Sequence, residues 1–276
     1  CSISNNSDFR CCYLLLRPSY IMLAQKLGLS LPSLKKVGAA ADERFIFTVD
    51  TTITGQSGSS SFILSVLGTN NFDVDWGDGS SDTGVTASTQ HDYARPGGVF
   101  TITITGDDIG IYFGNAFDKA KITNIINWGN QSINFNGTFY GCSNLTSSAT
   151  DAPIITTSDL RNTLRNCTTF NGSVTGWDVT TVNNFTNWCL SASAFQGSGL
   201  ETWDIRNATS AANFMTAGAL TTANYDALLI QWDTLTGYPS GLAITFGSTQ
   251  YSAGAAATAR ASLVTKGLVI TDGGQA

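Results

Sequence analysis

Hydrophobic and polar residues alternate along four short segments in the first half of the chain. In FIFTVD, residues 45–50, the side chains of Phe45, Phe47 and Val49 fall on one face and the polar residues on the other. A period of two residues is the pattern of a half-buried β-strand, and turns rich in Gly and Asp separate the segments. The same period recurs at residues 61–66, 72–76 and 99–105. We therefore predict an antiparallel β-sandwich over residues 45–106.

A glycine-rich turn follows the third of these segments. The chain reads VDWGDGS at residues 74–80 and HDYARPGGVFTITITG at residues 91–106. These stretches resemble the polycystic-kidney-disease (PKD) type of immunoglobulin-like domain, which has a WGDG turn, a His-x-Tyr and an alternating strand led by an aromatic residue. The matching residues are Trp76, Gly77, Asp78, Gly79, His91, Tyr93, Gly98, Phe100, Ile102 and Ile104. The resemblance implies a spacer or binding module rather than a catalyst.

Beyond residue 106 the chain repeats a unit of about 25 residues, a length typical of solenoid repeats. Trp177-Asp178-Val179 recurs one unit later as Trp203-Asp204-Ile205. Each unit is too small to bury its own apolar face, so neighbouring units must stack as a solenoid. The spacing predicts one short strand, at Trp-Asp-Val, and one short helical turn in each coil. The paired apolar positions of that turn are Phe135 and Phe139, Leu160 and Leu164, and Phe185 and Cys189.

The clearest unit, WDVTTVNNFTNWCLSASAFQG at residues 177–197, resembles a repeat found in bacterial surface proteins. It is similar to the BspA-like leucine-rich repeats, whose unit has this length and opens on Trp-Asp. The resemblance implies an extracellular recognition or adhesion surface over roughly residues 130–220. It carries no catalytic residues over to this chain.

The pattern changes again after residue 222. NYDALLIQW, residues 224–232, has the apolar period of a helix, and AGAAATARASLVTKG, residues 253–267, is alanine-rich and ends in a Lys-Gly stop signal. LAITF and LVITDGG are candidate strands. Because the last coil of a solenoid must be covered, we expect residues 223–276 to form an α/β cap.

The expected fold class is therefore mainly β with short helices. A PKD-like β-sandwich occupies residues 45–106, a small leucine-rich-repeat-like solenoid residues 107–222, and the cap the remainder. Residues 1–44 are predicted to form an N-terminal arm. Its start has two interpretations: Cys1 as the lipidated end of a mature lipoprotein, or Met22 as the true start. We favour Met22, because residues 1–21 resemble nothing that follows and the sequence after Met22 is not a convincing signal peptide.

Composition narrows the classes of partner. Only 12% of the residues are charged, against about 25% in an ordinary soluble domain. The net charge is -6, and no basic cluster extends beyond Lys35-Lys36, which argues against binding to a nucleic-acid backbone. No apolar run reaches the roughly 18 residues of a membrane span.

Residues that could support catalysis or zinc binding are few. The only histidine, His91, favours local hydrogen bonding over Ser-His-Asp chemistry. A zinc site needs three or four ligands, and Cys142, Cys167 and Cys189 lie in successive units without a CxxC pair. Equivalent positions in adjacent coils lie about 5 Å apart. A Cys142–Cys167 disulfide therefore stands as an alternative to free thiols.

The repeated Trp-Asp pairs also have two interpretations. Asp178 and Asp204 could be the paired acids of a glycosidase, but their periodicity favours acceptors that cap backbone N–H groups in each coil. Trp177 and Trp203 could stack on sugar rings, but residues in register favour a place in the core. We therefore predict no enzymatic site.

Three acids surround the glycine-rich turn, at Asp75, Asp78 and Asp82. They could hold a structural calcium ion, although an EF-hand loop would need more ligands and a closing Glu. The alternative is a hairpin turn in which Gly supplies positive φ and Asp accepts local N–H groups. We favour the turn and expect no cofactor, with calcium as the alternative.

Together these features predict a non-enzymatic binding or structural protein displayed on a surface. We find no clear export signal after Met22 and no sorting motif, and virion proteins need neither. Arrangements resembling PKD-like plus BspA-like units also occur in phage structural proteins. We therefore expect a phage virion component at the virion surface, oligomeric within its assembly, with other virion proteins and a host-surface protein or glycan as partners. The alternative is a bacterial cell-surface adhesin or lipoprotein.

Overall fold

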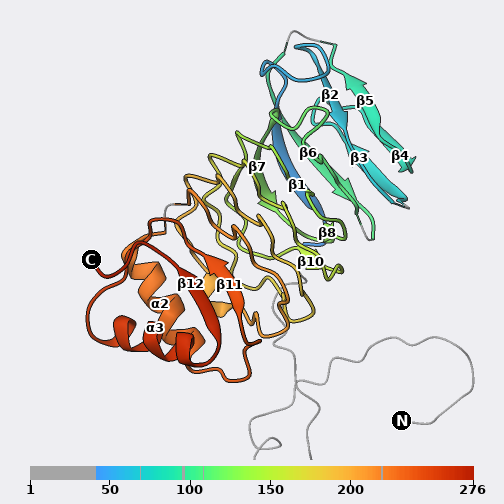
Figure 1. Ribbon diagram of the computed structural model, residues 1–276. Helices are drawn as coiled ribbons and strands as arrows, with labels where there is room; N and C mark the ends of the chain where they lie inside the picture. The colour runs from blue at the N-terminus through green and yellow to red at the C-terminus, as the bar shows by residue number, and fades with distance from the viewer. Residues whose placement is uncertain (1–41, 69, 95–96, 108, 219) are drawn as a thin grey trace, which may run out of the picture. The chain divides into compact units, whose positions relative to one another are not determined.

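The structure is a computed structural model that describes residues 42–68, 70–94, 97–107, 109–218 and 220–276 (Figure 1). Residues 42–276 form one compact unit. Over the described residues the fold is mainly β, with two short α-helices near the C-terminus, and at this level the predicted fold class is confirmed. No helix in this part of the chain is long and apolar enough to cross a membrane. The interpretations of Cys1 and Met22, and the predicted arm up to residue 41, concern residues outside the described ones.

Six strands form the largest sheet, in the order β4-β3-β6-β1-β7-β9. They are β1 (Phe45–Asp50), β3 (Phe72–Asp75), β4 (Ser81–Val85), β6 (Val99–Thr105), β7 (Ile122–Asn127) and β9 (Thr146–Ser147). Three of the predicted strands are confirmed as β1, β3 and β6. β1 pairs antiparallel with β6, and Phe47 lies opposite Ile102. Because this register places the apolar residues of both strands on one face, that face is fully buried.

Two further strands, β2 (Ser61–Leu64) and β5 (Thr89–Asp92), form a separate antiparallel pair. β2 confirms the fourth predicted strand. Phe62 of β2 packs against Phe47 of β1, with ring centroids 6.3 Å apart. The inward residues of the small sheet therefore join the same core as the large one.

β7 connects the large sheet to the repeats. β1 pairs with β6 on one side and with β7 on the other, and β7 pairs in parallel with β9. One sheet thus holds strands from both sides of residue 106, where the sequence predicts a domain boundary. The predicted boundary falls inside a continuous set of hydrogen bonds.

A buried ion pair fastens the loop before β2 to the segment before β7. The side chains of Asp118 and Lys121 are completely buried, with Lys121 Nζ 3.7 Å from Asp118 Oδ2. Lys121 Nζ also donates to the carbonyl oxygens of Gly58 and Ser61, at 2.7 and 2.8 Å. Burial lowers the pKa of Lys121, and Asp118 partly opposes that shift. The ammonium group has protein acceptors in place of water, as a buried charge requires.

After β7 the chain runs in stacked turns, called coils below, whose backbones bond to one another. The bonded residues in neighbouring coils are 23 to 27 positions apart, close to the predicted repeat length. Two short parallel strands, β8 (Ser132–Ile133) and β10 (Ile154–Ile155), belong to the same stack. Successive backbone bonds run from Phe139 N to Thr163 O (3.0 Å), from Leu164 N to Trp188 O (2.8 Å) and from Cys189 N to Phe214 O (3.0 Å).

The helical turn predicted in each coil is wrong. Asn162, Asn187 and Asn213 have φ values of 57°, 56° and 54°, and a right-handed helix cannot continue through this left-handed region. Asparagine visits the region more readily than most residues because its side chain bonds locally. Here Asn187 Nδ2 donates to Asn162 Oδ1 at 3.2 Å, and Asn213 Nδ2 donates to Asn187 Oδ1 at 3.1 Å. Each of these coils turns at a left-handed asparagine, and the asparagines form a ladder across the stack.

The strand predicted at each Trp-Asp-Val segment is also wrong. Residues 177–179 and 203–205 belong to no strand, and a short 3-10 helix, η1 (Leu200–Thr202), precedes the second segment. The parallel bridges between coils instead involve Asn184, which pairs with Asp159 on one side and Ser210 on the other. The Trp-Asp segments form corners of the coils.

The C-terminal elements are those that the sequence pattern predicts. They are α2 (Thr222–Asp233), β11 (Leu242–Thr245), α3 (Ala255–Thr265) and β12 (Leu268–Thr271). Thr221 begins α2 by accepting a hydrogen bond from Asn224 N on its hydroxyl, which is a standard N-cap. β11 and β12 pair in parallel, and Ile244 of β11 bridges to Ala211 of the last coil. The cap therefore continues the hydrogen-bonded stack.

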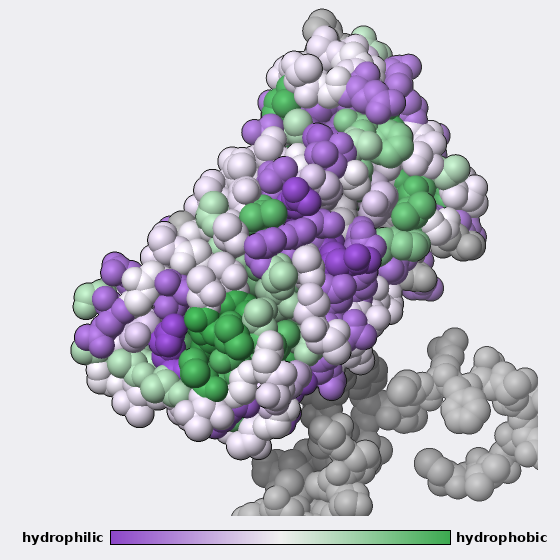
Figure 2. Space-filling model, in the orientation of Figure 1, coloured by the Kyte–Doolittle hydropathy of each residue, from purple (hydrophilic) through white to green (hydrophobic). Residues whose placement is uncertain are grey.

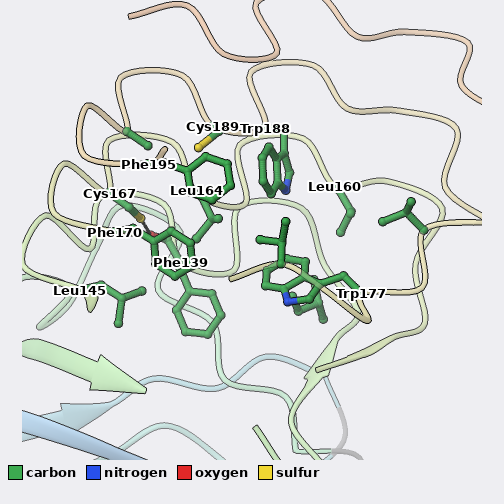
Figure 3. Close-up of a cluster of buried hydrophobic side chains, with 14 of the residues drawn as sticks. Phe139, Leu145, Leu160, Leu164, Cys167, Phe170, Trp177, Trp188, Cys189 and Phe195 are labelled. Atoms are coloured by element: carbon green, nitrogen blue, oxygen red, sulfur yellow. Dashed lines mark hydrogen bonds between the residues drawn. The ribbon is translucent and has the colours of Figure 1, made fainter. Parts of the chain in front are cut away.

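Aromatic side chains fill the interior of the coils and tie the units together (Figure 3). Trp188 lies with its ring centroid 4.7 Å from that of Trp203 and 5.2 Å from that of Phe214. Trp177 and Trp203 are 3% and 1% exposed, so both tryptophans of the repeated motif occupy the core, as their register favours.

Candidate functional site

The three acids of the glycine-rich turn each have a separate local partner. Asp75 Oδ1 accepts from Gly77 N at 2.9 Å, and Asp82 Oδ2 accepts from Trp76 Nε1 at 3.0 Å. Asp78 Oδ1 accepts from the backbone of Ser80 at 2.9 Å. Among the described residues no group of three or more His, Cys, Asp or Glu side chains is arranged to hold a metal ion. The structure does not bring these carboxylates together, and their geometry fits a turn rather than calcium ligation.

Asp78 is also bonded to the only histidine. Its Oδ2 lies 3.0 Å from His91 Nε2. Burial raises the pKa of Asp78, but hydrogen bonds from Ser80 and His91 outweigh it and lower the pKa to about 2. The imidazole stacks on Trp76, with centroids 4.6 Å apart and planes 4° from parallel. The Tyr93 ring lies nearly perpendicular to the imidazole, with centroids 4.6 Å apart, and its hydroxyl donates to Trp76 O at 3.3 Å. These contacts hold the turn against β5.

This cluster contains a serine, a histidine and an aspartate, yet it lacks the order of a hydrolytic triad. Ser80 Oγ and Asp78 Oδ2 both approach the same ring nitrogen, His91 Nε2, at 3.4 and 3.0 Å. In a triad one ring nitrogen faces the nucleophile and the other faces the acid. Ser80 Oγ instead lies 2.5 Å from Asp78 Oδ1, so the arrangement fixes the turn.

The cysteines of the coils are buried thiols. Cys142, Cys167 and Cys189 are free and fully buried, which settles the alternative between a Cys142–Cys167 disulfide and free thiols. Cys167 Sγ donates to Phe139 O at 3.0 Å. Burial raises the pKa of all three thiols. Cys167 and Cys189 lie among aromatic and aliphatic side chains in the core, where they take the place of small apolar residues (Figure 3).

The acids of the repeated Trp-Asp pairs accept backbone N–H groups two residues on. Asp178 Oδ1 accepts from Thr180 N at 3.1 Å, and Asp204 Oδ1 accepts from Arg206 N at 3.1 Å. The hydroxyl of Thr180 and the guanidinium of Arg206 lower the pKa of their respective partners. A glycosidase pair would need one acid with a raised pKa. Both acids instead accept backbone N–H groups within a turn, as their periodicity favours.

A concave feature along the coils borders these acids. One hollow, of about 280 Å³, is lined by Glu201, Thr202, Trp203, Asp204, Gln231 and Leu235. A second, of about 240 Å³, is lined by Trp177, Asp178, Val179, Thr180 and their neighbours Thr175 and Gly176. Both hollows also share Thr202 and Asp204. The two hollows are therefore neighbours, and together they are called the Trp-Asp groove below.

The sequence located only part of this groove. Trp177, Asp178, Trp203 and Asp204 stand out because they repeat. Residues 231 and 235 were missed because α2 reaches this edge only by packing against η1. No periodic signal in the sequence connects them to the coils.

The exposed face drawn in Figure 2 is mostly polar or weakly polar, with an apolar patch over the C-terminal cap. On the coils, equivalent and partly exposed positions carry unlike side chains: Tyr140, Arg165 and Leu190 follow one another at the repeat spacing. The backbone hydrogen bonds between these coils repeat from one coil to the next. The backbone is therefore regular while the surface chemistry varies along it.

Residues 111–234 match the family model described as "Mycoplasma protein of unknown function, DUF285". The match covers the coils and α2 and leaves out the strands β1 to β6 and the end of the cap. No curated protein and no solved structure matches this chain. The family's description assigns no activity, so the function rests on the geometry.

Proposed function

We propose that this protein is a non-enzymatic binding or structural protein displayed on a surface, and specifically a phage virion component that contacts the host surface. Tail fibre, capsid fibre and decoration protein are the roles that this proposal includes. Its place is the virion surface, and its partners are other virion proteins and a host-surface protein or glycan.

The proposal includes a finer description of the fold. Residues 45–106 would be a PKD-like β-sandwich, followed by a BspA-like leucine-rich-repeat solenoid and an α/β cap. Two observations support it: inward residues of two sheets share a core, and coils bond at the repeat spacing. In this proposal the sandwich, which β1 and β7 join to the coils, would close one end of the solenoid.

The observation that carries the functional proposal is the regular hydrogen-bonded stack with variable outward residues. Backbone bonds between coils and the aromatic interior fix the scaffold. The partly exposed side chains at equivalent positions, such as Tyr140, Arg165 and Leu190, differ from coil to coil while the backbone bonds repeat. Rigid elements that present variable side chains suit recognition.

A bacterial cell-surface adhesin or lipoprotein is the second candidate. It is favoured by the matched family's description, which names a Mycoplasma protein. The two candidates share the recognition surface and differ in the particle that carries it.

Mass spectrometry of the native protein separates the candidates. The virion proposal expects the chain among the proteins of purified phage particles, with a native N-terminus at Met22. A diacylglycerol-modified Cys1 in a bacterial membrane fraction would refute it. Binding to the host is checked separately by incubating the fluorescently labelled full chain with candidate host cells and with cells stripped of surface protein or glycan.

A further inference from the structure

The Trp-Asp groove joins an apolar floor to an acidic rim. Leu235 lines the hollow beside α2, together with the acids Glu201 and Asp204. The hollow beside it adds Asp178. Three carboxylates therefore border a depression whose base is partly hydrocarbon.

The charge of this rim is only partly neutralised. Arg206 is ion-paired with Asp204, with Nη2 2.6 Å from Oδ2. Among the described residues Asp178 and Glu201 have no ion pair; each accepts a short-range hydrogen bond, Asp178 from Thr180 and Glu201 from Gly199 N at 3.1 Å. In each of these two carboxylates one oxygen accepts a backbone N–H group, while the negative charge remains available to a partner.

The groove offers no aromatic platform for a sugar. Pyranose rings pack on open ring faces, and Trp177 and Trp203 are only 3% and 1% exposed. Their faces are occupied by the core, where the two rings stack with centroids 6.2 Å apart. A negatively charged rim over a small aliphatic floor instead complements a lysine or arginine side chain, whose hydrocarbon stem packs while its charged end pairs with a carboxylate.

We propose that the Trp-Asp groove binds an extended basic segment of a partner protein. Aliphatic stems of its Lys or Arg side chains would lie against Leu235, and their cationic ends would pair with Asp178 and Glu201. The inference rests on the proposed function, because it selects protein over glycan as the partner class for the surface-displayed stack.

The test measures binding of fluorescent pentalysine to the full chain at about physiological ionic strength, where long-range attraction between exposed charges is screened. The groove variant is Asp178→Asn with Glu201→Gln; both amides can still accept the backbone N–H bonds of the turns. The matched control is Glu43→Gln with Asp107→Asn, which removes the same charge from exposed positions outside the groove. We expect the groove variant to bind about tenfold more weakly or worse, and the control to change affinity less than about twofold.

A second probe tests the floor. A peptide of five 2,4-diaminobutyrate residues carries its charges on shorter stems, so we expect it to bind about threefold more weakly or worse than pentalysine. Leu235→Ser should remove that preference. Equal affinity for both peptides in the parent chain would mean that the floor takes no part and would overturn the proposal.

The remaining outcomes are equally decisive. Equal losses in the groove variant and the control would show diffuse electrostatic attraction, and groove-dependent binding of chitopentaose without binding of pentalysine would show a glycan site; either result overturns the inference. Binding of the labelled chain to host cells distinguishes a failure of the groove inference from a failure of the proposed function. Undiminished cell binding by the groove variant would reject the groove and keep the proposed function. Groove-dependent peptide binding by a chain that is absent from virions would keep the groove and reject the proposed function.

Discussion

Replacing Gly77 by alanine should destabilise the protein much more than the same change at Gly79. Both glycines belong to the WGDG turn and both have positive φ, 77° and 91°. A Cβ built on Gly77 would lie 2.3 Å from Thr101 O and 3.1 Å from Thr101 N, whereas a Cβ on Gly79 would meet nothing within 4 Å. The two variants therefore separate the cost of a left-handed backbone from the cost of a collision between the turn after β3 and strand β6.

The two costs can be estimated separately. At Gly79, alanine incurs only the cost of the left-handed conformation, about 1–2 kcal/mol. At Gly77 the same cost applies, and the backbone of Thr101 must also move, which adds about 1–3 kcal/mol by analogy with overpacked cores. For a chain of this size each kcal/mol lowers Tm by about 2–4 °C.

Thermal and urea unfolding of the full chain, followed by circular dichroism and tryptophan fluorescence, would measure both variants. We expect Gly77→Ala to unfold first, with a free energy of unfolding reduced by about 2–5 kcal/mol in total. Coinciding losses at the two glycines would refute the reasoning, because the close approach of the turn to β6 would then contribute nothing. Probes that disagree within one variant would locate the loss in the β1–β6 part alone.

Three further predictions test other contacts. The pKa of Asp78 in the folded chain, about 2, lies below its usual value of 3.8. The carboxylate therefore stabilises the fold above about pH 4, and this contribution disappears as the pH falls towards 2. The Tm measured between pH 4 and pH 2 should depend less on pH in Asp78→Asn than in the parent chain. Lys121→Met should cost about 3–5 kcal/mol, because it leaves buried Asp118 without its counter-ion. Lys266→Met, at the partly exposed ion pair with Asp233, should cost about 0–1 kcal/mol. Comparable losses of the two variants in urea unfolding would contradict the role of the buried pair. With Cys1, Cys11 and Cys12 changed to serine, a thiol reagent should label the coils only at the rate of unfolding, since burial raises the pKa of the remaining thiols; rapid labelling of the native chain would show an open core.

The strands and helices that the sequence predicted correctly share a strong local pattern. The alternation of Phe45, Phe47 and Val49 has one solution with a buried face, and β1 adopts it. The apolar period of residues 224–232 and the alanine-rich run before Lys266 likewise gave α2 and α3. In these elements local propensity and burial favour the same conformation, which is why the sequence alone suffices to predict them.

The conformation within the coils could not be read in the same way. Apolar residues four positions apart, such as Leu160 and Leu164, fit a helical turn, yet Asn162 between them has a φ of 57°. The pair reaches the core because backbone bonds to the next coil replace the bonds of a helix. Those bonds join residues far apart in the chain, so they are invisible to a local period. The candidate site follows the same division: Asp178 and Asp204 were marked by repetition, while Leu235 joined them only through packing.

The sequence by itself determined the units of this protein: alternating strands first, repeats of about 25 residues next, and a helical cap last. It predicted the turn at WGDG too, because glycine readily adopts positive φ and aspartate accepts hydrogen bonds from local N–H groups. Tertiary structure alone decided that the first sheet continues into the coils, that asparagines rather than helices turn three of the coils, and that α2 completes an acidic groove. The physical reason is that residue types fix local preferences and burial, whereas hydrogen bonds and contacts between distant segments exist only after the chain has stacked.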